Sequence, residues 1–265
     1  PSYNPNNRSS FSASHYRNRA ITDILEPGSA LKPLIVAAAL ESGKYRENSY
    51  IETSPGYVKI GAKKINDKRN FGRINLQTVL QKSSNVGVTK IAMSMDPEYL
   101  WGVLKRFGLG QSTASGFPGE SAGLLNHYAN WRDISQATMA YGYGLSVTPL
   151  QLAQAYAVLG AKGLQYPVSL LKIEQDPIAR RIVKPDTADS ILSMMESVVQ
   201  VGGTGTQAAV EGYRIAGKTG TSRKAAKGGY AENRYAAVFA GLAPASNPRL
   251  AIVVVVDEPN AGEYY

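Results

Sequence analysis

The stretch EPGSALKPLIVAAALESG, residues 26–43, decides how the rest of the chain is interpreted. Its first three residues, Glu-Pro-Gly, are typical of a turn. From Ser29 to Ser42 apolar residues recur at helical spacing and Gly43 follows, so the stretch predicts a helix that begins at Ser29. Pro33 falls near the first turn of this helix, where its missing N–H costs little.

Ser29 and Lys32 form the pattern S-x-x-K at the start of the predicted helix. Residues three apart lie on one helix face, so the lysine amine can reach the serine hydroxyl. A serine needs a nearby base to become a nucleophile, and a lysine whose pKa is lowered by burial can serve. The helix N-terminus also supplies N–H groups for a developing oxyanion. Alone the pattern is weak, because residues 169–172 also match it, in a segment that predicts a strand.

Two further short motifs follow along the chain. Ser83-Ser84-Asn85 is S-x-N and interrupts two predicted helical pieces, 76–82 and 86–95. By itself it is equally well a polar helix break whose side chains satisfy loose backbone groups. Residues 218–221, KTGT, contain K-T-G in a predicted strand over 213–221, where a glycine often marks the close approach of another group to the backbone.

Outward from these motifs, the chain shows helices first and strands last. The segment 50–73 predicts short strands and turns. Further predicted helices are 135–140, 149–160 and 187–199, and the predicted strands are 213–221, 235–242 and 250–257. This order predicts an α+β fold, an antiparallel sheet flanked by helices with a helical subdomain. The polar residues 1–18 predict a loop or arm, which leaves 19–265 as one domain.

Composition excludes several kinds of site. The absence of cysteine excludes a disulfide framework, a thiolate metal site and a cysteine nucleophile. The two histidines, His15 and His127, stand in no metal-ligand spacing, so neither a metal nor another cofactor is predicted. The longest apolar run, Leu250 to Val256, is far too short to cross a membrane.

The net charge is +9, but the basic residues are dispersed. Nucleic acid is therefore not a predicted partner. The densest basic group alternates with Gly, Ile and Asn, and it predicts a solvated loop or a patch that faces an acidic surface. Its members are Lys59, Lys63, Lys64, Lys68, Arg69 and Arg73.

A competing motif overlaps K-T-G. Residues 212–219, GYRIAGKT, fit the P-loop pattern G-x-x-x-x-G-K-[ST], and the apolar run 251–256 followed by Asp257 resembles a Walker B strand. A P-loop needs an apolar strand before its first glycine and a helix after Lys-Thr. Here residues 205–211 are a poor strand and turn-forming residues follow the motif, so a nucleotide hydrolase is the less favoured hypothesis.

Longer stretches carry a resemblance to a known family. RNRAITDILEPGSALKP, LQKSSNVGVTKIAM, ATMAYGYGLSVTPLQLA and GYRIAGKTGTSRK resemble class B penicillin-binding proteins, most of all the septal, division-specific (penicillin-binding protein 3) type of Gram-negative bacteria. FPGESAG at 117–123 and the C-terminal VVVVDEPNAGEYY fit as well. S-x-x-K, S-x-N and K-[ST]-G in this order are the acyl-serine signature that this family shares with serine β-lactamases, and they imply the same fold.

The resemblance implies a role for each motif residue. Ser29 attacks the penultimate D-Ala carbonyl of a D-Ala-D-Ala stem peptide, and Lys32 takes its proton. Ser83 and Lys218 form the proton path to the departing D-Ala, and Asn85 hydrogen-bonds the bound peptide or Lys32. The backbone N–H groups of Ser29 and Thr221 form the oxyanion hole. The substrate-binding positions implied by the resemblance are Thr219, Gly220, Thr221, Tyr141, Tyr143, Arg223, Tyr264 and Tyr265.

The implied activity is that of a peptidoglycan D,D-transpeptidase that crosslinks stem peptides during septal wall synthesis and is acylated by β-lactams. A serine β-lactamase is an alternative, although the E-x-x-L-N context of a class A enzyme is missing, since Glu120 has the wrong spacing. A non-catalytic β-lactam sensor domain is another. One departure from the family is Ala30, which replaces a common Thr.

The resemblance also implies surroundings for the chain. The expected location is the periplasmic face of the inner membrane, with an anchor, a pedestal domain and terminal sheet elements outside these residues. The expected partners, besides stem peptides and β-lactams, are membrane proteins of the division complex.

Overall fold

The centre of the molecule is a three-stranded antiparallel sheet, seen in a computed structural model that describes residues 6, 17–226 and 229–259. The strands, in the order β7-β8-β9, are β7 (Ala216–Ala226), β8 (Gly229–Ala243) and β9 (Leu250–Asp257). Lys218 is paired with Ala240, which is paired in turn with Val253. The three predicted strands are confirmed, but β7 begins at Ala216 and continues well past Thr221, and β8 begins at Gly229, six residues before the predicted start.

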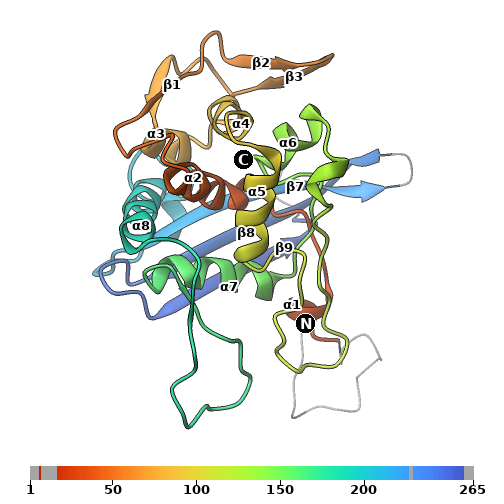
Figure 1. Cartoon of the computed structure of the whole chain (residues 1–265), viewed down its shortest axis with the longest axis vertical. Helices are drawn as coiled ribbons and strands as arrows, with labels where there is room; N and C mark the ends of the chain where they lie inside the picture. The colour runs from red at the N-terminus through yellow and green to blue at the C-terminus, as the bar shows by residue number, and fades with distance from the viewer. Residues whose placement is uncertain (1–5, 7–16, 227–228, 260–265) are drawn as a thin grey trace.

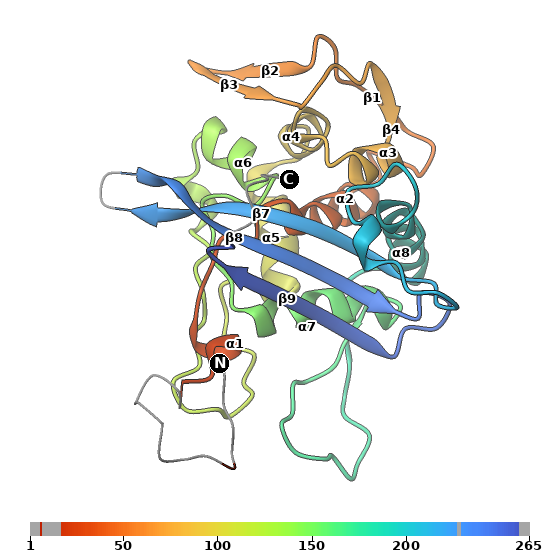
Figure 2. The ribbon, with the colours of Figure 1, turned by 180° about the vertical axis from the view of Figure 1, so that it is seen from behind.

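Helices cover one face of this sheet (Figure 1), and Figure 2 looks onto the other face. The helices are α1 (Arg19–Thr22), α2 (Lys32–Glu41), α3 (Leu76–Gln81), α4 (Asn85–Met93), α5 (Pro97–Arg106), α6 (Asp133–Met139), α7 (Pro149–Gly160) and α8 (Pro185–Val199), with 3-10 turns η3 (Gly28–Leu31), η4 (Tyr128–Asn130) and η5 (Thr206–Ala208). The predicted helices at 76–82, 86–95, 135–140, 149–160 and 187–199 are confirmed to within a few residues at their ends. The α+β class is thereby confirmed.

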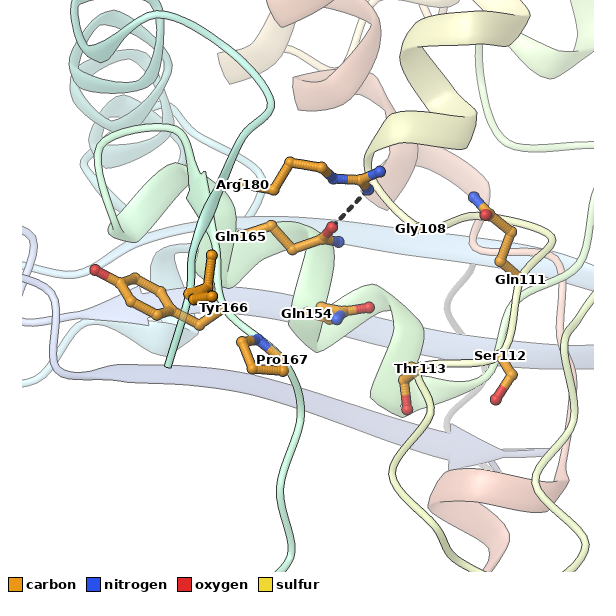
Figure 3. Close-up of a pocket in the computed structure, with 10 residues that line it drawn as sticks. Gly108, Gln111, Ser112, Thr113, Gln154, Gln165, Tyr166, Pro167 and Arg180 are labelled. Atoms are coloured by element: carbon orange, nitrogen blue, oxygen red, sulfur yellow. Dashed lines mark hydrogen bonds between the residues drawn. The ribbon is translucent and has the colours of Figure 1, made fainter. Parts of the chain in front are cut away.

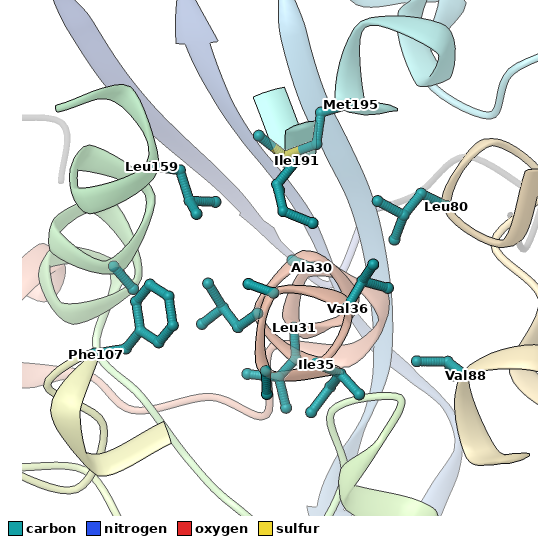
Figure 4. Packing of buried hydrophobic residues seen from close by; sticks show 14 of the residues in the cluster. Ala30, Leu31, Ile35, Val36, Leu80, Val88, Phe107, Leu159, Ile191 and Met195 are labelled. Atoms are coloured by element: carbon teal, nitrogen blue, oxygen red, sulfur yellow. The ribbon is translucent and has the colours of Figure 1, made fainter. Parts of the chain in front are cut away.

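Helix α2 runs through the middle of the core (Figure 4). Every residue from Leu34 to Ala39 is fully buried, as expected of a helix that is apolar on all sides. Leu80 of α3, Val88 of α4, and Ile191 and Met195 of α8 surround it, as do the side chains of Phe107 and Leu159. The site residues at its start are therefore carried by a helix that is packed on all sides.

The predicted helix over 29–42 differs from the structure in its first turn. The chain enters α2 through η3, so regular α-helix begins at Lys32. Gly28 has a φ of +55°, a left-handed conformation that glycine adopts without strain, and this turns the chain directly before Ser29.

Small antiparallel pairs flank the helices. β1 (Tyr50–Glu52) pairs with β4 (Arg73–Asn75), and β2 (Tyr57–Ile60) pairs with β3 (Lys63–Asn66), which confirms the short strands expected in 50–73. β5 (Leu164–Gln165) pairs with β6 (Arg180–Arg181). Figure 1 shows the β2–β3 hairpin beyond α4, at the opposite end of the molecule from α1.

Helix α5 was not predicted, although the signals for it are present in the sequence. Asp96 caps its N-terminus by accepting from the N–H groups of Glu98 and Tyr99, and Pro97 occupies the first turn. Its buried side chains, Leu100, Val103 and Leu104, lie at the spacing of an amphipathic helix.

Two sequence hypotheses are contradicted by the backbone. The P-loop hypothesis fails because Lys218 and Thr219 lie inside β7, where a P-loop would require a loop that opens a helix. The predicted strand around Ser169 is a loop instead, and the exposed Ser169 hydroxyl donates to the carbonyl of Leu171, two residues on. The second S-x-x-K match therefore has no helix to bring its two residues together.

The N-terminal arm and the length of the helices remain to be compared with the sequence predictions. The predicted arm, residues 1–18, falls almost wholly outside the described residues. Among the helices of the described ranges, none has both the length and the apolar character needed to cross a bilayer.

Candidate active site

Two glycines bring strand β7 against the turn that carries Ser29. A Cβ on Gly220 would lie 2.5 Å from the Pro27 carbonyl oxygen, and one on Gly28 would lie 2.8 Å from that of Thr221. Only a hydrogen atom fits at either place. The backbone nitrogen of Thr221 would lie 3.3 Å from the same Cβ on Gly28. The backbone of Thr221 is therefore next to the start of η3.

Lys32 is fully buried and joins α2 to the loop between α3 and α4. Its Nζ donates to the Ser83 carbonyl oxygen at 2.6 Å, to Asn85 Oδ1 at 2.7 Å and to Ser83 Oγ at 3.1 Å. Burial, assisted by the positive charge of Lys218, holds the pKa of this amine well below the usual value for lysine. The structure thus brings together the first two motifs.

Lys218 reaches the same loop from the sheet. Its Nζ, also fully buried, donates to Ser83 Oγ at 3.0 Å and to the Thr219 carbonyl oxygen at 3.0 Å. Desolvation lowers the pKa of Lys218 to about 7. The Ser83 hydroxyl therefore lies between two amines, and a hydroxyl can accept from one while it donates to the lone pair of the other. This is the geometry of a proton relay.

Ser29 itself is partly buried, and its hydroxyl makes no hydrogen bond to a described residue. Helix spacing predicted that the Lys32 amine could reach this hydroxyl. In the structure the three N–H donors of a charged Lys32 point to acceptors of Ser83 and Asn85 instead. A neutral Lys32 amine has only two N–H donors, and these can serve its two shorter contacts, with the Ser83 carbonyl oxygen and Asn85 Oδ1. The lone pair of the nitrogen is then available to accept a proton.

Asp67 is a site-building residue that the sequence analysis missed. Its Oδ1 accepts from the N–H groups of Asn85 at 2.6 Å and Val86 at 3.0 Å, and its Oδ2 accepts from Ser84 Oγ at 2.6 Å. Ser84 Oγ in turn accepts from the Gly87 N–H at 2.8 Å and caps α4. Asp67 thus fixes the S-x-N motif, and no sequence signal marks it, because the two lie in separate elements.

Three tyrosines stack edge to face beside the turn that carries Ser29. The ring centroids of Tyr141 and Tyr143 are 5.7 Å apart, and those of Tyr143 and Tyr230 are 5.4 Å apart. Tyr143 accepts from the backbone N–H of Arg223 at 3.3 Å, and Tyr230 donates to Glu26 Oε1 at 2.9 Å. The structure therefore brings together the predicted Tyr141, Tyr143 and Arg223 and adds Tyr230 and Glu26.

The surroundings of these groups shift their acid–base behaviour. Burial raises the pKa of Tyr141 and that of Glu26, whose carboxylate nevertheless accepts from the Gly144 N–H at 2.7 Å. The pKa of Tyr230 is raised by burial and by the adjacent Glu26. Two further tyrosines that the resemblance gives as substrate-binding positions, Tyr264 and Tyr265, lie outside the described residues.

Thr219 and Thr221 point to the sheet face opposite Lys218 and Gly220, as strand alternation requires. Thr219 Oγ1 lies 2.9 Å from Thr204 Oγ1, within hydrogen-bond distance. Thr204 is therefore, like Asp67, a residue beside the motifs that the sequence analysis did not predict. Thr221 is partly buried, next to the start of η3.

A hollow of about 260 Å³ lies elsewhere, between α5, α7 and the loop after β5 (Figure 3). None of the motif residues lines it. Its one cation, Arg180, donates to Gln165 Oε1 at 2.7 Å and to the Arg106 carbonyl oxygen at 3.1 Å. The chemistry of the molecule is therefore concentrated around Ser83 and not in this hollow. Across the described residues, no group of three or more His, Asp or Glu could hold a metal ion.

Comparisons with known proteins show the family of the chain. The family model for the penicillin-binding protein transpeptidase domain matches residues 1–265. The peptidoglycan D,D-transpeptidase FtsI of Escherichia coli K12 is 47% identical over 265 residues, which are 100% of this chain and 45% of that protein. The probable peptidoglycan D,D-transpeptidase PenA of Neisseria gonorrhoeae is 43% identical, with the same coverage.

A solved structure extends the likeness to three dimensions. The apo transpeptidase domain of Burkholderia pseudomallei penicillin-binding protein 3 superposes with a TM-score of 0.90 at 46% identity, over 94% of this chain and 76% of that one. The chain spans 45% of the length of the curated relatives named above. From its sequence and from its fold alike, the chain belongs to the penicillin-binding protein transpeptidase family.

Proposed function

We propose that the chain carries out the acyl transfer of a septal peptidoglycan D,D-transpeptidase, with Ser29 as the acylated nucleophile. The observation that carries the proposal is the buried array in which Lys32 and Lys218 share the Ser83 hydroxyl, next to a turn that presents Ser29. Two amines with lowered pKa values, linked through one hydroxyl, are suited to take a proton from a serine and return it to a leaving group.

Acylation begins when Ser29 Oγ attacks the penultimate D-Ala carbonyl carbon and gives its proton to neutral Lys32. The N–H groups of Ser29 and Thr221 stabilise the negative charge that develops on the carbonyl oxygen. The C–N bond to the terminal D-Ala then breaks. The leaving nitrogen takes a proton that passes from Lys32 through Ser83 Oγ, and Lys218 holds this hydroxyl in place by a hydrogen bond. Thr219 and Thr221 bind the terminal carboxylate, whose negative charge Lys218 favours.

Crosslinking reverses these roles. The amine of a second stem peptide attacks the acyl carbon and loses a proton to the Lys32–Ser83 pair. The bond from Ser29 Oγ to the acyl group breaks and the hydroxyl is restored, so that atoms and charges balance. A β-lactam follows the first half of this path, and its ring-opened product stays attached to Ser29.

The surroundings of Glu120 argue against the β-lactamase alternative. Its Oε1 accepts from the N–H and hydroxyl of Thr113, each at 2.6 Å, and its Oε2 accepts from the N–H and hydroxyl of Ser115. These hydrogen bonds hold the pKa of Glu120 below its usual value despite the cost of burial. A carboxylate bound inside its own loop is unsuited to activate water at an acyl-enzyme.

The septal role, the periplasmic face of the inner membrane and the division-complex partners are part of the same proposal. They are supported by the resemblance to septal enzymes and by the names of the relatives, which are peptidoglycan D,D-transpeptidases. The site residues are likewise proposed by their match to the family motifs and by the contacts described above.

Intact mass after mixing with benzylpenicillin tests the proposal, with Ser29→Ala as the matched variant. A persistent adduct of one drug per chain, absent from S29A, is the expected result. An adduct that disappears within seconds while penicilloate accumulates would assign the site to a β-lactamase. Release of D-Ala from a D-Ala-D-Ala donor peptide, with formation of a new amide to an added amine, separates the transpeptidase from a sensor domain, which would be acylated without turnover.

A further inference from the structure

A dense group of positive charge lies in residues 57–73, which we call the basic hairpin: β2, its two-residue turn, β3 and the segment that follows, through the first residue of β4. The only acid in this segment is Asp67, against six cations. More than half of the net charge of +9 is therefore concentrated in 17 residues. The side chains that supply it are all exposed: Lys59, Lys63, Lys64, Lys68, Arg69 and Arg73.

The register of the hairpin places like charges opposite one another. Lys59 is the cross-strand partner of Lys64, so both side chains emerge on the same face. Directly opposed like charges destabilise a strand pair. Val58 and Ile65 form the neighbouring pair on the other face, and Ile65 is buried, so the lysine face is the one turned to solvent. An arrangement that works against local stability is expected where a binding function requires it.

Aromatic rings, and not carboxylates, hold several of these cations. Lys64 Nζ is 4.0 Å from the ring centroid of Tyr57, and Arg73 Cζ is 5.0 Å from that of Tyr50. A ring face orients a cation but leaves its charge unneutralised. The salt bridges found among the described residues are made by Arg17, Arg19, Lys162, Arg214, Lys224 and Arg234, and none of them involves Lys59, Lys63, Lys64, Arg69 or Arg73. The oriented charges of the hairpin thus remain available to an external anion.

The one acid of the segment does not balance this charge, because its carboxylate serves the active site. Asp67 accepts from Ser84 and from the N–H groups of Asn85 and Val86. On the residue before it, the Asn66 carbonyl oxygen accepts from Asn85 Nδ2 at 3.4 Å. The base of the basic hairpin is therefore in contact with the S-x-N motif, which connects the charged strands to the loop that carries Ser83.

We propose that the basic hairpin binds carboxylate groups of the peptidoglycan strand whose stem peptides enter the active site. The inference rests on the proposed function, which supplies a substrate with acidic peptides. Contact with the S-x-N motif favours the substrate over a lipid surface as the source of the anion. Lysine ammonium groups are compact point charges on flexible stems, so they suit carboxylates that recur along a polymer in variable positions.

The test compares Lys59→Gln/Lys64→Gln with Lys172→Gln/Arg249→Gln, a control that removes the same charge from exposed residues far along the chain. The full chain is sedimented with Gram-negative peptidoglycan sacculi at low salt. We expect K59Q/K64Q to weaken binding roughly five- to tenfold, and the control to change it much less. Amidation of the sacculus carboxylates is expected to remove the difference between wild type and K59Q/K64Q.

Acylation by benzylpenicillin is measured in parallel, because it reports on the proposed function and involves only the catalytic groups. Its rate is expected to stay within about twofold of wild type in K59Q/K64Q. Equal binding of wild type and K59Q/K64Q to untreated sacculi would overturn the inference while leaving the acylation result intact. The inference would also be overturned if K59Q/K64Q bound phosphatidylglycerol vesicles more weakly than wild type but bound sacculi equally well. That result would make the hairpin a membrane contact.

Discussion

Lys32 and Lys218 share one hydrogen-bond partner, the hydroxyl of Ser83, at 3.1 and 3.0 Å from their Nζ atoms. Both amines are fully buried, so two ammonium ions would repel each other where little water screens them. The two amines therefore titrate as a pair, and their protons leave in coupled steps. The first two predictions follow from this relationship.

Acylation by benzylpenicillin is expected to accelerate with rising pH, because Lys32 must be neutral to accept the Ser29 proton. The rise is expected well below the ordinary lysine range, since burial and Lys218 both lower the pKa of Lys32. In Lys218→Gln the neighbouring positive charge is gone, the pKa of Lys32 increases, and the rise moves to higher pH. Lys172→Gln, an exposed lysine, serves as control. A pH–rate profile that K218Q leaves in place would contradict the coupling.

Stability is expected to increase with pH across the interval between the folded and unfolded lysine pKa values. For Lys218 these are about 7 and 10.5, so between them the unfolded chain binds a proton that the folded chain does not. The gain is expected to be a few kcal/mol, since each unit of pKa difference is worth about 1.4 kcal/mol. Urea unfolding at pH 7 and pH 10 measures it. Lys218→Met should reduce the slope, while buried Lys32 keeps part of it; an equally steep slope in K218M would assign the effect to other groups.

Tyr156→Phe is expected to destabilise the fold by about 1–3 kcal/mol, because a buried acceptor loses its donor. The Tyr156 hydroxyl donates to the Ala30 carbonyl oxygen at 2.7 Å, directly after Ser29, and both groups are fully buried. Slower acylation is expected to accompany the loss, since this bond fixes the turn that carries the nucleophile. Denaturant unfolding is the measurement, with the exposed Tyr213→Phe as control. Equal free energies of unfolding for Y156F and Y213F would show that the hydrogen bond from Tyr156 to Ala30 makes no net contribution to stability.

The extent to which the site could be predicted differs from residue to residue. Ser29, Lys32, Ser83 and Lys218 were predicted because each belongs to a short pattern, and the structure places the lysines and Ser83 in contact. Helix α5 was missed, although Asp96 and Pro97 mark its start and Leu100, Val103 and Leu104 have the spacing of an amphipathic helix.

Asp67, Thr204 and Tyr230 could not have been identified from the sequence. Each reaches the site through a tertiary contact between elements that are separate in the chain, and none belongs to a motif. The contact of Gly220 with the turn before Ser29 could be predicted in part. A glycine in an apolar strand predicted the close approach of something, but only the structure shows that it is the Pro27 carbonyl.

Asp67→Ala is expected to lower stability by about 1–2 kcal/mol, the usual cost of losing a helix cap. The variant leaves the N–H groups of Asn85 and Val86 and the Ser84 hydroxyl without their acceptor. Acylation is expected to fall more than stability explains, because Asn85 also holds Lys32. Asp67→Asn, which keeps one carbonyl acceptor, should recover part of both losses. Asp176→Ala, on an exposed loop, is the control, and rates unchanged in D67A would deny Asp67 a positioning role.

Gly220→Ala is expected to abolish most acylation while the rest of the sheet survives. The new methyl group would lie 2.5 Å from the Pro27 carbonyl oxygen and 3.0 Å from the Ala30 nitrogen, both backbone atoms that cannot rotate away. Strand β7 must then move away from η3, which separates Thr221 from the oxyanion position while Ser29 and Lys32 stay on their helix. The variant should therefore fold, with a near-wild-type circular dichroism spectrum, yet acylate far more slowly. Gly102→Ala in α5 is the matched control, because Gly102 has no positive φ and a Cβ there would meet only the end of the Arg106 side chain, at 3.8 Å. Normal acylation of G220A would mean that the oxyanion site does not depend on this contact between strand and turn.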